Sequence, residues 1–205
     1  MSAAAARLFA WLQDAAFYRE MHLAAANLLP AADDRRNWLD VGCGPGVLTR
    51  IAGERGYAAR GIDRDPDMIE AAVRLAAERR NPAKFAVSDI ETAIADEARY
   101  DVVSASSLLV VVPEPAAALR RLVSLAKPDG LVLVVEASRE MTRARAFSEA
   151  LSRGFAHRAY MLQVWATFRS GRTLPHSTFD QPGLTASRHP VLGGLADAWI
   201  VKRAQ

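Results

Sequence analysis

The sequence predicts an α/β domain built around a mostly parallel sheet, and three observations point to it. Short apolar segments alternate along the chain with longer amphipathic ones. The short segments are largely apolar throughout, which is typical of strands covered by helices on both faces. A turn with three glycines, residues 42–46, joins the first of these strands to a helix.

The individual elements follow from periodicity, capping residues and breakers. Residues 3–29 carry leucine and alanine at helical spacing and stop at Pro30, which predicts one or two helices. Asp65 and Pro66 supply an N-cap and a first-turn proline for a later helix. We expect strands at 37–42, 58–63, 85–88, 100–105 and 131–136, helices at 46–55, 67–80 and 113–126, and a hairpin of strands 184–191 and 195–202 around two glycines.

Length and composition indicate one domain and exclude several classes of protein. The 205 residues, of which 51% are hydrophobic, suit a single core. We expect one domain over 1–205, with a helical cap (1–30), a core (31–136) and a helical segment with the hairpin (137–205). No apolar run reaches the roughly 18 residues that cross a bilayer. Charged residues interrupt the N-terminal segment, so a secretory signal is not expected and the localisation is expected to be cytoplasmic.

The charge and the cysteine content limit the classes of partner and metal site that the protein could have. A net charge of +3, with the basic residues spread among 23 acidic ones, does not favour nucleic acid. The single cysteine excludes an internal disulfide and any multi-cysteine metal site, and we expect no metal.

The turn after the first strand is the most specific feature. Glycines at 42, 44 and 46 let the backbone approach a ligand closely, and the N–H groups of the following helix point toward it. The dinucleotide pattern G-x-G-x-x-G would need glycine where the chain has Val47. Asp40, two residues before the first glycine, suits a cationic ligand better than a pyrophosphate. An ordinary strand-to-helix turn is the alternative.

The stretch from Asp40 to Gly46, D-x-G-x-G-x-G, resembles motif I of the class I S-adenosylmethionine-dependent methyltransferases. In that family the acidic residue and the loop bind the ammonium and carboxylate of the methionine moiety. The resemblance therefore implies that S-adenosyl-L-methionine is the cofactor and that it contacts Asp40, Gly42, Cys43, Gly44 and Gly46. The position of Cys43 is more often a small apolar residue than a nucleophile.

Two more carboxylates end the next two strands. Asp63 can accept hydrogen bonds from the hydroxyls of a ribose, and the alternative is an anion at a helix N-terminus. Asp89 can accept from the adenine amino group while Ile90 covers the ring, and the alternative for Asp89 is an N-cap. Arg64 and Met68 can pack on an adenine face, and a core role is equally open for Met68.

The resemblance covers residues 36–136 through segments at 61–69, 87–89, 100–104 and 125–133. The last segment is similar to that of small-molecule methyltransferases of the quinone-biosynthesis type. The resemblance implies a Rossmann-like, doubly wound sheet of seven strands in the order 3-2-1-4-5-7-6, with Ser104 among the cofactor-binding residues. It also implies in-line methyl transfer to a small-molecule acceptor.

The acceptor side is less determined, and no catalytic residue is assigned. The Asp/Asn-Pro-Pro-Tyr/Phe block of enzymes that methylate amino groups is absent after residue 104, and valines stand at 110 and 111, where many relatives have histidine. Tyr18 and His22 share a helix face and are candidates for contact with the cofactor or acceptor, unless they only pack between helices. His157 and Tyr160 lie on a basic stretch that either lines a pocket for an anionic acceptor or is simply solvated, with arginines at 143, 145, 153, 158 and 169.

Two other functions stay open at this stage. A nicotinamide-dependent oxidoreductase would share the Asp63 position but not the turn. A non-catalytic protein that binds S-adenosylmethionine, in a regulatory or partner role, would not need the missing base. A homodimer is possible, and the identity of the acceptor is not predicted.

Overall fold

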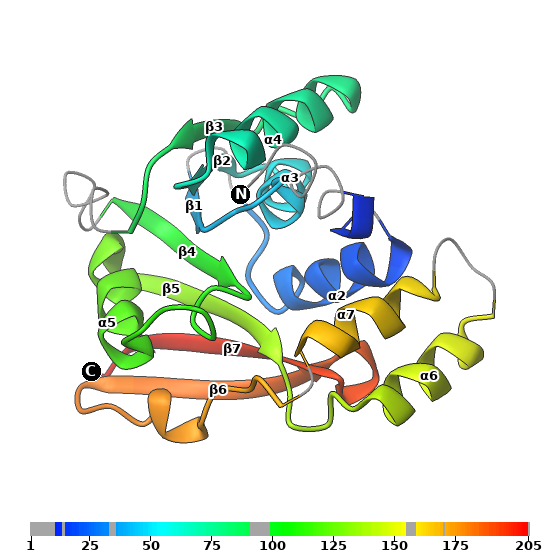
Figure 1. Cartoon of the computed structure of the whole chain (residues 1–205). Helices are drawn as coiled ribbons and strands as arrows, with labels where there is room; N and C mark the ends of the chain where they lie inside the picture. Colours follow the sequence, from blue (N-terminus) through cyan, green and yellow to red (C-terminus); the bar gives the residue numbers. More distant parts are fainter. Residues whose placement is uncertain are drawn as a thin grey trace.

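A computed structural model of the chain describes residues 11–13, 15–32, 36–90, 99–154, 159–169 and 171–204. Within these residues seven strands form one sheet in the order β3-β2-β1-β4-β5-β7-β6 (Figure 1). The first five pair in parallel, and β7 runs antiparallel to both β5 and β6. The strands are β1 (Asn37–Val41), β2 (Ala58–Asp63), β3 (Lys84–Val87), β4 (Tyr100–Ser106), β5 (Ala126–Ala137), β6 (Leu184–Val191) and β7 (Ala196–Arg203). The expected strand order and C-terminal hairpin are confirmed.

The helices lie where the sequence predicts them, with small differences at their ends. They are α2 (Ala16–Ala26), α3 (Val47–Glu54), α4 (Pro66–Glu78), α5 (Pro115–Leu125), α6 (Arg143–Ser152) and α7 (Met161–Arg169). The side chain of Asp65 caps α4 by accepting a hydrogen bond from the backbone N–H of Asp67 at 3.0 Å. Residues 3–10 of the expected N-terminal helical segment lie outside the described residues.

Strand β5 is longer than the apolar segment that predicts it. The sequence predicts a strand at 131–136, but β5 begins at Ala126, which pairs with Tyr100. The register then shifts, so that the next aligned pair is Val102 with Leu131. Partner pairing, which the local pattern does not contain, therefore sets this boundary.

The sheet is covered on both faces, as its apolar strands predict. On β5, Leu133 and Val135 are buried with residues of α2, α3 and α7, whereas Val132 and Val134 are buried with residues of α5. Alternate side chains of one strand thus enter two separate cores. Among the described residues no helix is both long and apolar enough for a membrane span.

The glycines of the β1–α3 turn are required by the backbone. Gly42, Gly44 and Gly46 have φ values of 66°, 51° and 78°, in the left-handed region. A Cβ on Gly46 would lie 2.5 Å from Cε1 of Phe85, and a Cβ on Gly42 would lie 2.9 Å from Cδ1 of Leu108. Only glycine combines these angles with this close packing. The turn lies at the carboxyl end of the sheet, where ligands bind in open α/β folds.

Candidate active site

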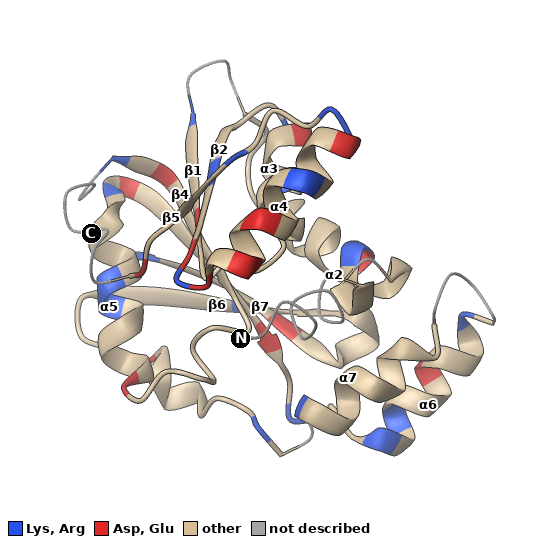
Figure 2. Cartoon of the chain, turned by 45° about the horizontal axis from the view of Figure 1, so that its top comes forward, with Lys and Arg blue, Asp and Glu red and all other residues tan. Residues whose placement is uncertain are grey.

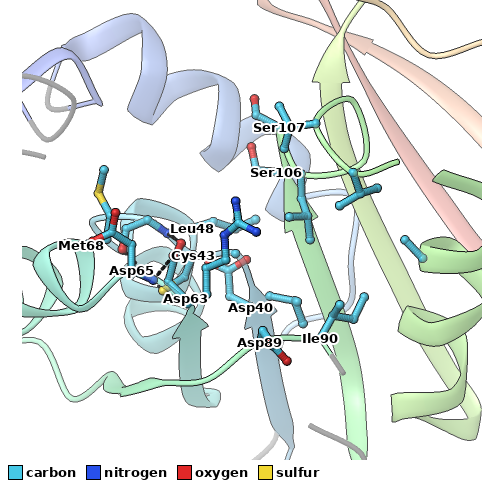
Figure 3. Close-up of a pocket in the computed structure, with 18 of the residues that line it drawn as sticks. Asp40, Cys43, Leu48, Asp63, Asp65, Met68, Asp89, Ile90, Ser106 and Ser107 are labelled. Atoms are coloured by element: carbon cyan, nitrogen blue, oxygen red, sulfur yellow. Dashed lines mark hydrogen bonds between the residues drawn. The ribbon is translucent and has the colours of Figure 1, made fainter. Parts of the chain in front are cut away.

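A cavity of about 1100 Å³ lies over the carboxyl ends of the strands (Figure 3). Asp63 and Met68 lie on one side of the close-up, and Ser106 and Ser107 lie on the other. Drug-sized ligands occupy cavities of about 300–1,000 Å³. The volume is therefore sufficient for two small molecules side by side.

Asp63 places a half-buried carboxylate in the cavity wall. Its Oδ2 accepts a hydrogen bond from the Gly44 N–H at 2.9 Å, and its Oδ1 accepts one from the Asp65 N–H at 2.9 Å. A carboxylate oxygen can accept more than one hydrogen bond, so each oxygen keeps acceptor capacity toward the cavity. These two hydrogen bonds hold the carboxylate in place, and they also stabilise the conformation of the β1–α3 turn.

Asp40 also lines the cavity, but it is buried. Its Oδ2 accepts from Thr49 Oγ1 at 2.7 Å, and its Oδ1 accepts from Ser104 Oγ at 2.7 Å. Burial raises the pKa of Asp40 to about 6, against the lowering effect of the two hydroxyl hydrogen bonds. Ser104, expected at the cofactor, is fully buried behind Asp40, where its hydroxyl also accepts from Trp38 Nε1 at 2.8 Å. Its position serves to orient the carboxylate.

The other residues expected at the cofactor are distributed around the same cavity. Arg64, Met68, Asp89 and Ile90 line it together with Gly42, Cys43 and Gly44. Gly46, also expected at the cofactor, does not line the cavity; it is the N-cap of α3 and packs against Phe85. Burial raises the pKa of the Cys43 thiol well above its usual range, so this thiol stays protonated and is a poor nucleophile.

Helix α2 supplies the wall opposite the turn with Tyr18 and His22, both almost fully buried. Nδ1 of His22 lies 2.7 Å from the Tyr18 carbonyl oxygen, and Nε2 lies 2.7 Å from Ser106 Oγ. A carbonyl oxygen only accepts, so Nδ1 carries the proton and Nε2 accepts from the Ser106 hydroxyl. Burial lowers the pKa of His22 to about 4, so the ring is neutral at neutral pH.

Tyr18 stays protonated beside His22. Burial raises the pKa of the Tyr18 phenol to about 12, and its oxygen accepts a hydrogen bond from Gln13 Nε2 at 3.0 Å. Behind this wall, Glu136 accepts from the N–H groups of Leu109 and Val110 at 2.9 and 3.3 Å. Burial raises the pKa of Glu136 to about 7.

Two residues expected on the acceptor side remain, and the structure describes one of them. Tyr160 is 60% exposed and does not line it, and His157 lies outside the described residues. Among the described residues no group of His, Cys, Asp and Glu side chains could hold a metal ion.

Several polar residues of the cavity wall are not singled out from the sequence, among them Gln13, Ser106 and Ser107, and Arg169 is named there only as one arginine of a basic stretch. The end of β4 is itself a signal for Ser106, because carboxyl ends of parallel strands share one edge. Ser107 has a φ of 56°, which is uncommon outside glycine. The basic stretch is a local signal for Arg169, but it does not separate this arginine from its neighbours, since the packing of α7 brings Arg169 to the cavity.

A family model described as a methyltransferase domain matches residues 11–180. The chain belongs to the class I S-adenosylmethionine-dependent methyltransferases. The sheet order and the glycine turn at the end of β1 agree with this assignment.

Curated relatives of this methyltransferase are similar over part of their length. The ubiquinone biosynthesis O-methyltransferase of Coxiella burnetii is 27% identical over 142 residues, which cover 69% of this chain and 54% of the relative. The protein of the same name from Neisseria meningitidis serogroup C is 40% identical over 98 residues, which cover 46% of this chain and 41% of the relative. The chain thus spans about half the length of the curated relatives it matches.

Solved structures support the fold. A putative S-adenosyl-L-methionine-dependent methyltransferase from Methanococcus maripaludis aligns with a TM-score of 0.72 at 17% identity, over 100% of this chain and 94% of that one. The plantazolicin methyltransferase BpumL in complex with SAH aligns with a TM-score of 0.61 at 15% identity, over 92% and 84% of the two chains.

The cavity itself fits the cofactor of this family. The three positive-φ glycines form a backbone cradle in which a Cβ on Gly42 would collide with Leu108. The carboxylate of Asp63 keeps acceptor capacity beside that cradle, and the charge of Asp40 lies just beneath it. A ligand with a diol and a cationic group matches this donor and acceptor set.

Proposed function

We propose that the protein transfers a methyl group from S-adenosylmethionine to the hydroxyl oxygen of a small molecule. The observation that carries this proposal is a single cavity that joins the glycine turn and Asp63 to the hydrogen-bonded pair His22–Ser106. The names of the curated O-methyltransferase relatives support an oxygen acceptor. When bound, the cofactor supplies a sulfonium methyl group that is displaced in line.

The cofactor would lie along the ends of β1, β2 and β3. Asp63 would accept from the ribose hydroxyls, and Asp89 with Ile90 would hold the adenine. The N–H groups of the turn would face the methionine carboxylate, and the negative charge of Asp40 would attract the ammonium. These roles agree with the placement of the residues in the cavity wall, where Arg64, Met68 and Cys43 complete the contact surface.

The acceptor would lie over β4, where its proton has a route to a base. The Ser106 hydroxyl donates to Nε2 of His22 and also contacts the Tyr18 phenol. Its oxygen has two lone pairs, so it keeps capacity to accept a hydrogen bond from an acceptor hydroxyl. As the acceptor oxygen gains the methyl group, its proton passes to Ser106 and the serine proton passes to Nε2. Positioned proton acceptors contribute about 10²–10⁴-fold in rate, and the lowered pKa of His22 places its contribution at the lower end of this range.

Cofactor binding tests the first part of the proposal. Calorimetric titration of the protein with S-adenosylhomocysteine and with NADH should give heat only with the former. Tight NADH binding without a response to S-adenosylhomocysteine would contradict the proposal and favour an oxidoreductase. The missing glycine at Val47 argues against that second candidate.

Enzymatic turnover tests the second part of the proposal, which is methyl transfer to a hydroxyl compound. A panel of phenols, carboxylates, amines and thiols, read by release of S-adenosylhomocysteine, should give product with at least one hydroxyl compound. Binding of the cofactor with silence across the whole panel would instead favour a regulatory or partner protein without catalysis.

The His22–Ser106 pair gives a sharper variant test with any acceptor that reacts. Ser106→Ala and His22→Gln should each lower kcat by about 10²-fold or more, while the Kd for S-adenosylhomocysteine stays unchanged. Ser107→Ala is the matched control, because it removes a neighbouring cavity hydroxyl that is not bonded to His22 in the structure. An equal loss in all three variants would contradict the relay.

The proposal also covers the assembly and the cellular location of the protein. A homodimer is proposed on the exposed apolar side chains of α6 and α7, among them Phe147, Leu151 and Phe168. Light scattering at several concentrations would test it. The cytoplasmic localisation stays a prediction, which cell fractionation would test.

A further inference from the structure

Arg169 is a cation built into the acceptor side of the cavity. It is the last residue of α7, whose sequence MLQVWATFR holds no other charged residue (Figure 2). The helix is fixed by apolar packing: Trp165 lies with its ring centroid 6.0 Å from Phe17 and 5.8 Å from Tyr18 of α2. This packing places the half-buried Arg169 in the cavity wall.

The guanidinium of Arg169 has no ion-pair partner among the described residues. The nearby ionisable groups are Tyr18 and Glu136, and the charge of Arg169 lowers the pKa of each against the larger effect of burial. The neighbouring wall is formed by neutral groups that can form hydrogen bonds: Gln13, Ser106 and Ser107. Glu136 is buried and does not line the cavity, and among the described residues no ion pair joins it to Arg169, so the guanidinium is available to an anion in the ligand.

The strand order places Arg169 away from the cofactor turn. Glu136 interacts electrostatically with Arg169 and lies near the end of β5, whereas the glycine turn follows β1. Strand β4 separates β1 from β5, and neighbouring strands lie about 4.8 Å apart, so the two strand ends are about 10 Å from each other. Arg169 therefore faces the acceptor half of the cavity.

The two halves of the cavity differ in charge. The half at β1, β2 and β3 carries the carboxylates of Asp40, Asp63, Asp65 and Asp89. Two other arginines reach the wall. Arg64 follows β2, and Arg121 of α5 donates to the Ile90 carbonyl oxygen and to Ser124. Both therefore belong to the adenosyl side, which leaves Arg169 as the cation described at the acceptor side.

The rest of the acceptor side is mostly apolar. The segment between β4 and α5 contributes Leu108, Val111, Val112 and Pro113 to the wall, together with one exposed carboxylate, that of Glu114. An acceptor that fills this space has an apolar body, with polar groups that meet Ser106 at one point and Arg169 at another.

We propose that the methyl acceptor is an apolar hydroxy acid, whose carboxylate pairs with Arg169 while its hydroxyl reaches Ser106. This inference rests on the proposed methyl transfer and names its substrate class. The guanidinium fork matches a carboxylate through two parallel N–H donors, and such charge-assisted pairs contribute strongly in a partly desolvated site. The pairing would also orient the hydroxyl, which is the condition for in-line transfer.

The test uses the full chain saturated with S-adenosylhomocysteine. Probes are 4-hydroxybenzoate, 3,4-dihydroxybenzoate and 4-hydroxyphenylacetate, each compared by calorimetry with its own carboxamide, which keeps the shape and removes the charge. At least one acid should bind about 10- to 100-fold more tightly than its amide. In Arg169→Met this preference should disappear, and Arg169→Lys should keep only part of it, because lysine lacks the fork.

Two controls separate this inference from the proposed function. Arg172→Met removes an exposed arginine outside the cavity wall and should leave every affinity unchanged. Arg169→Met should still bind S-adenosylhomocysteine like the unmodified chain. Equal binding of acids and amides, no binding of any acid, or a loss of S-adenosylhomocysteine binding in Arg169→Met would each overturn the inference. Failure of the unmodified chain to bind S-adenosylhomocysteine would overturn the proposed function instead.

Discussion

Asp40 and Asp63 stand on neighbouring strands but have different surroundings. Asp40 is buried, and both of its oxygens accept hydroxyl hydrogen bonds, from Thr49 and Ser104. Asp63 is half-buried and accepts only backbone N–H groups. Asp63 can therefore bind a ligand directly through its remaining acceptor capacity, whereas Asp40 would act mainly through its charge. Burial makes that charge sensitive to pH, since it raises the pKa of Asp40 to about 6.

Replacement of Asp63 tests its direct role. Asp63→Ala should weaken S-adenosylhomocysteine binding by about 1.5–3 kcal/mol, because a charged acceptor for two hydroxyls is lost. Isothermal titration measures the change, and thermal unfolding checks that the turn survives without its two backbone contacts. Asp67→Ala is the matched control, because it removes a nearby carboxylate at the start of α4 that does not line the cavity. Unchanged affinity in Asp63→Ala would remove this residue from the site.

The cavity shows which of its residues a sequence pattern can reveal. Asp63 and Asp89 are visible because each follows a short apolar strand, and parallel strand ends share one edge. The environment of Asp40 is not visible, since the hydroxyl of Ser104 comes from the neighbouring strand β4, which is distant in the sequence. Arg169 is one of several arginines in a basic stretch, and only the packing of α7 on α2 distinguishes it.

At the scale of elements, the β1–α3 turn combines backbone strain with tight packing, and a pair of glycines can separate the two. Gly46 and Gly183 have nearly equal φ values, 78° and 77°. A Cβ on Gly46 would collide with the Phe85 ring at 2.5 Å, whereas a Cβ on Gly183 would meet nothing within 4 Å.

Alanine at each position should therefore give different losses. Gly183→Ala should lower the free energy of unfolding by about 1–2 kcal/mol, which is the cost of the left-handed angle alone. Gly46→Ala should lower it by about 1–3 kcal/mol more, because the ring or the turn must shift. Urea unfolding of the two variants measures both values. Equal losses would show that Phe85 moves aside freely and that the turn is not held by packing.

The elements also show where local sequence stops being sufficient. Strands β1 to β4 and helices α3 to α5 follow from apolar runs, caps and breakers, which act over a few residues. The start of β5 at Ala126 depends instead on its pairing with Tyr100 of β4. Likewise, the spacing of Tyr18 and His22 predicts a common helix face but not that this face closes a cavity against Ser106.

For the whole molecule, the doubly wound topology collects buried ionisable groups beneath one cavity. Burial raises the pKa of Glu136 from 4.5 to about 7 and that of Asp40 from 3.8 to about 6, whereas it lowers the pKa of His22 from 6.5 to about 4. Each group prefers its neutral form in the folded state. Stability should thus fall with rising pH through the two carboxyl groups and rise with pH through His22, in overlapping windows.

Glu136→Gln isolates the largest of these effects at neutral pH. The folded state binds the Glu136 proton more tightly than the unfolded state, so the free energy of unfolding should fall as pH rises from about 4.5 to 7. A pKa raised from 4.5 to about 7 corresponds to a loss of up to about 3 kcal/mol in the free energy of unfolding. Glutamine keeps an oxygen for the N–H groups of Leu109 and Val110 and cannot ionise.

The variant and the unmodified chain should therefore have similar stability at pH 4, below the pKa of 4.5 that Glu136 has in the unfolded chain, and the variant should be more stable at pH 8. Urea unfolding at both pH values measures this difference. Glu140→Gln is the control, because Glu140 is exposed and pairs with Arg145 at the surface, where such pairs contribute little. Parallel pH profiles for the unmodified chain and Glu136→Gln would mean that Glu136 stays ionised across the range. Its two backbone N–H donors and the charge of Arg169 would then outweigh the cost of burial.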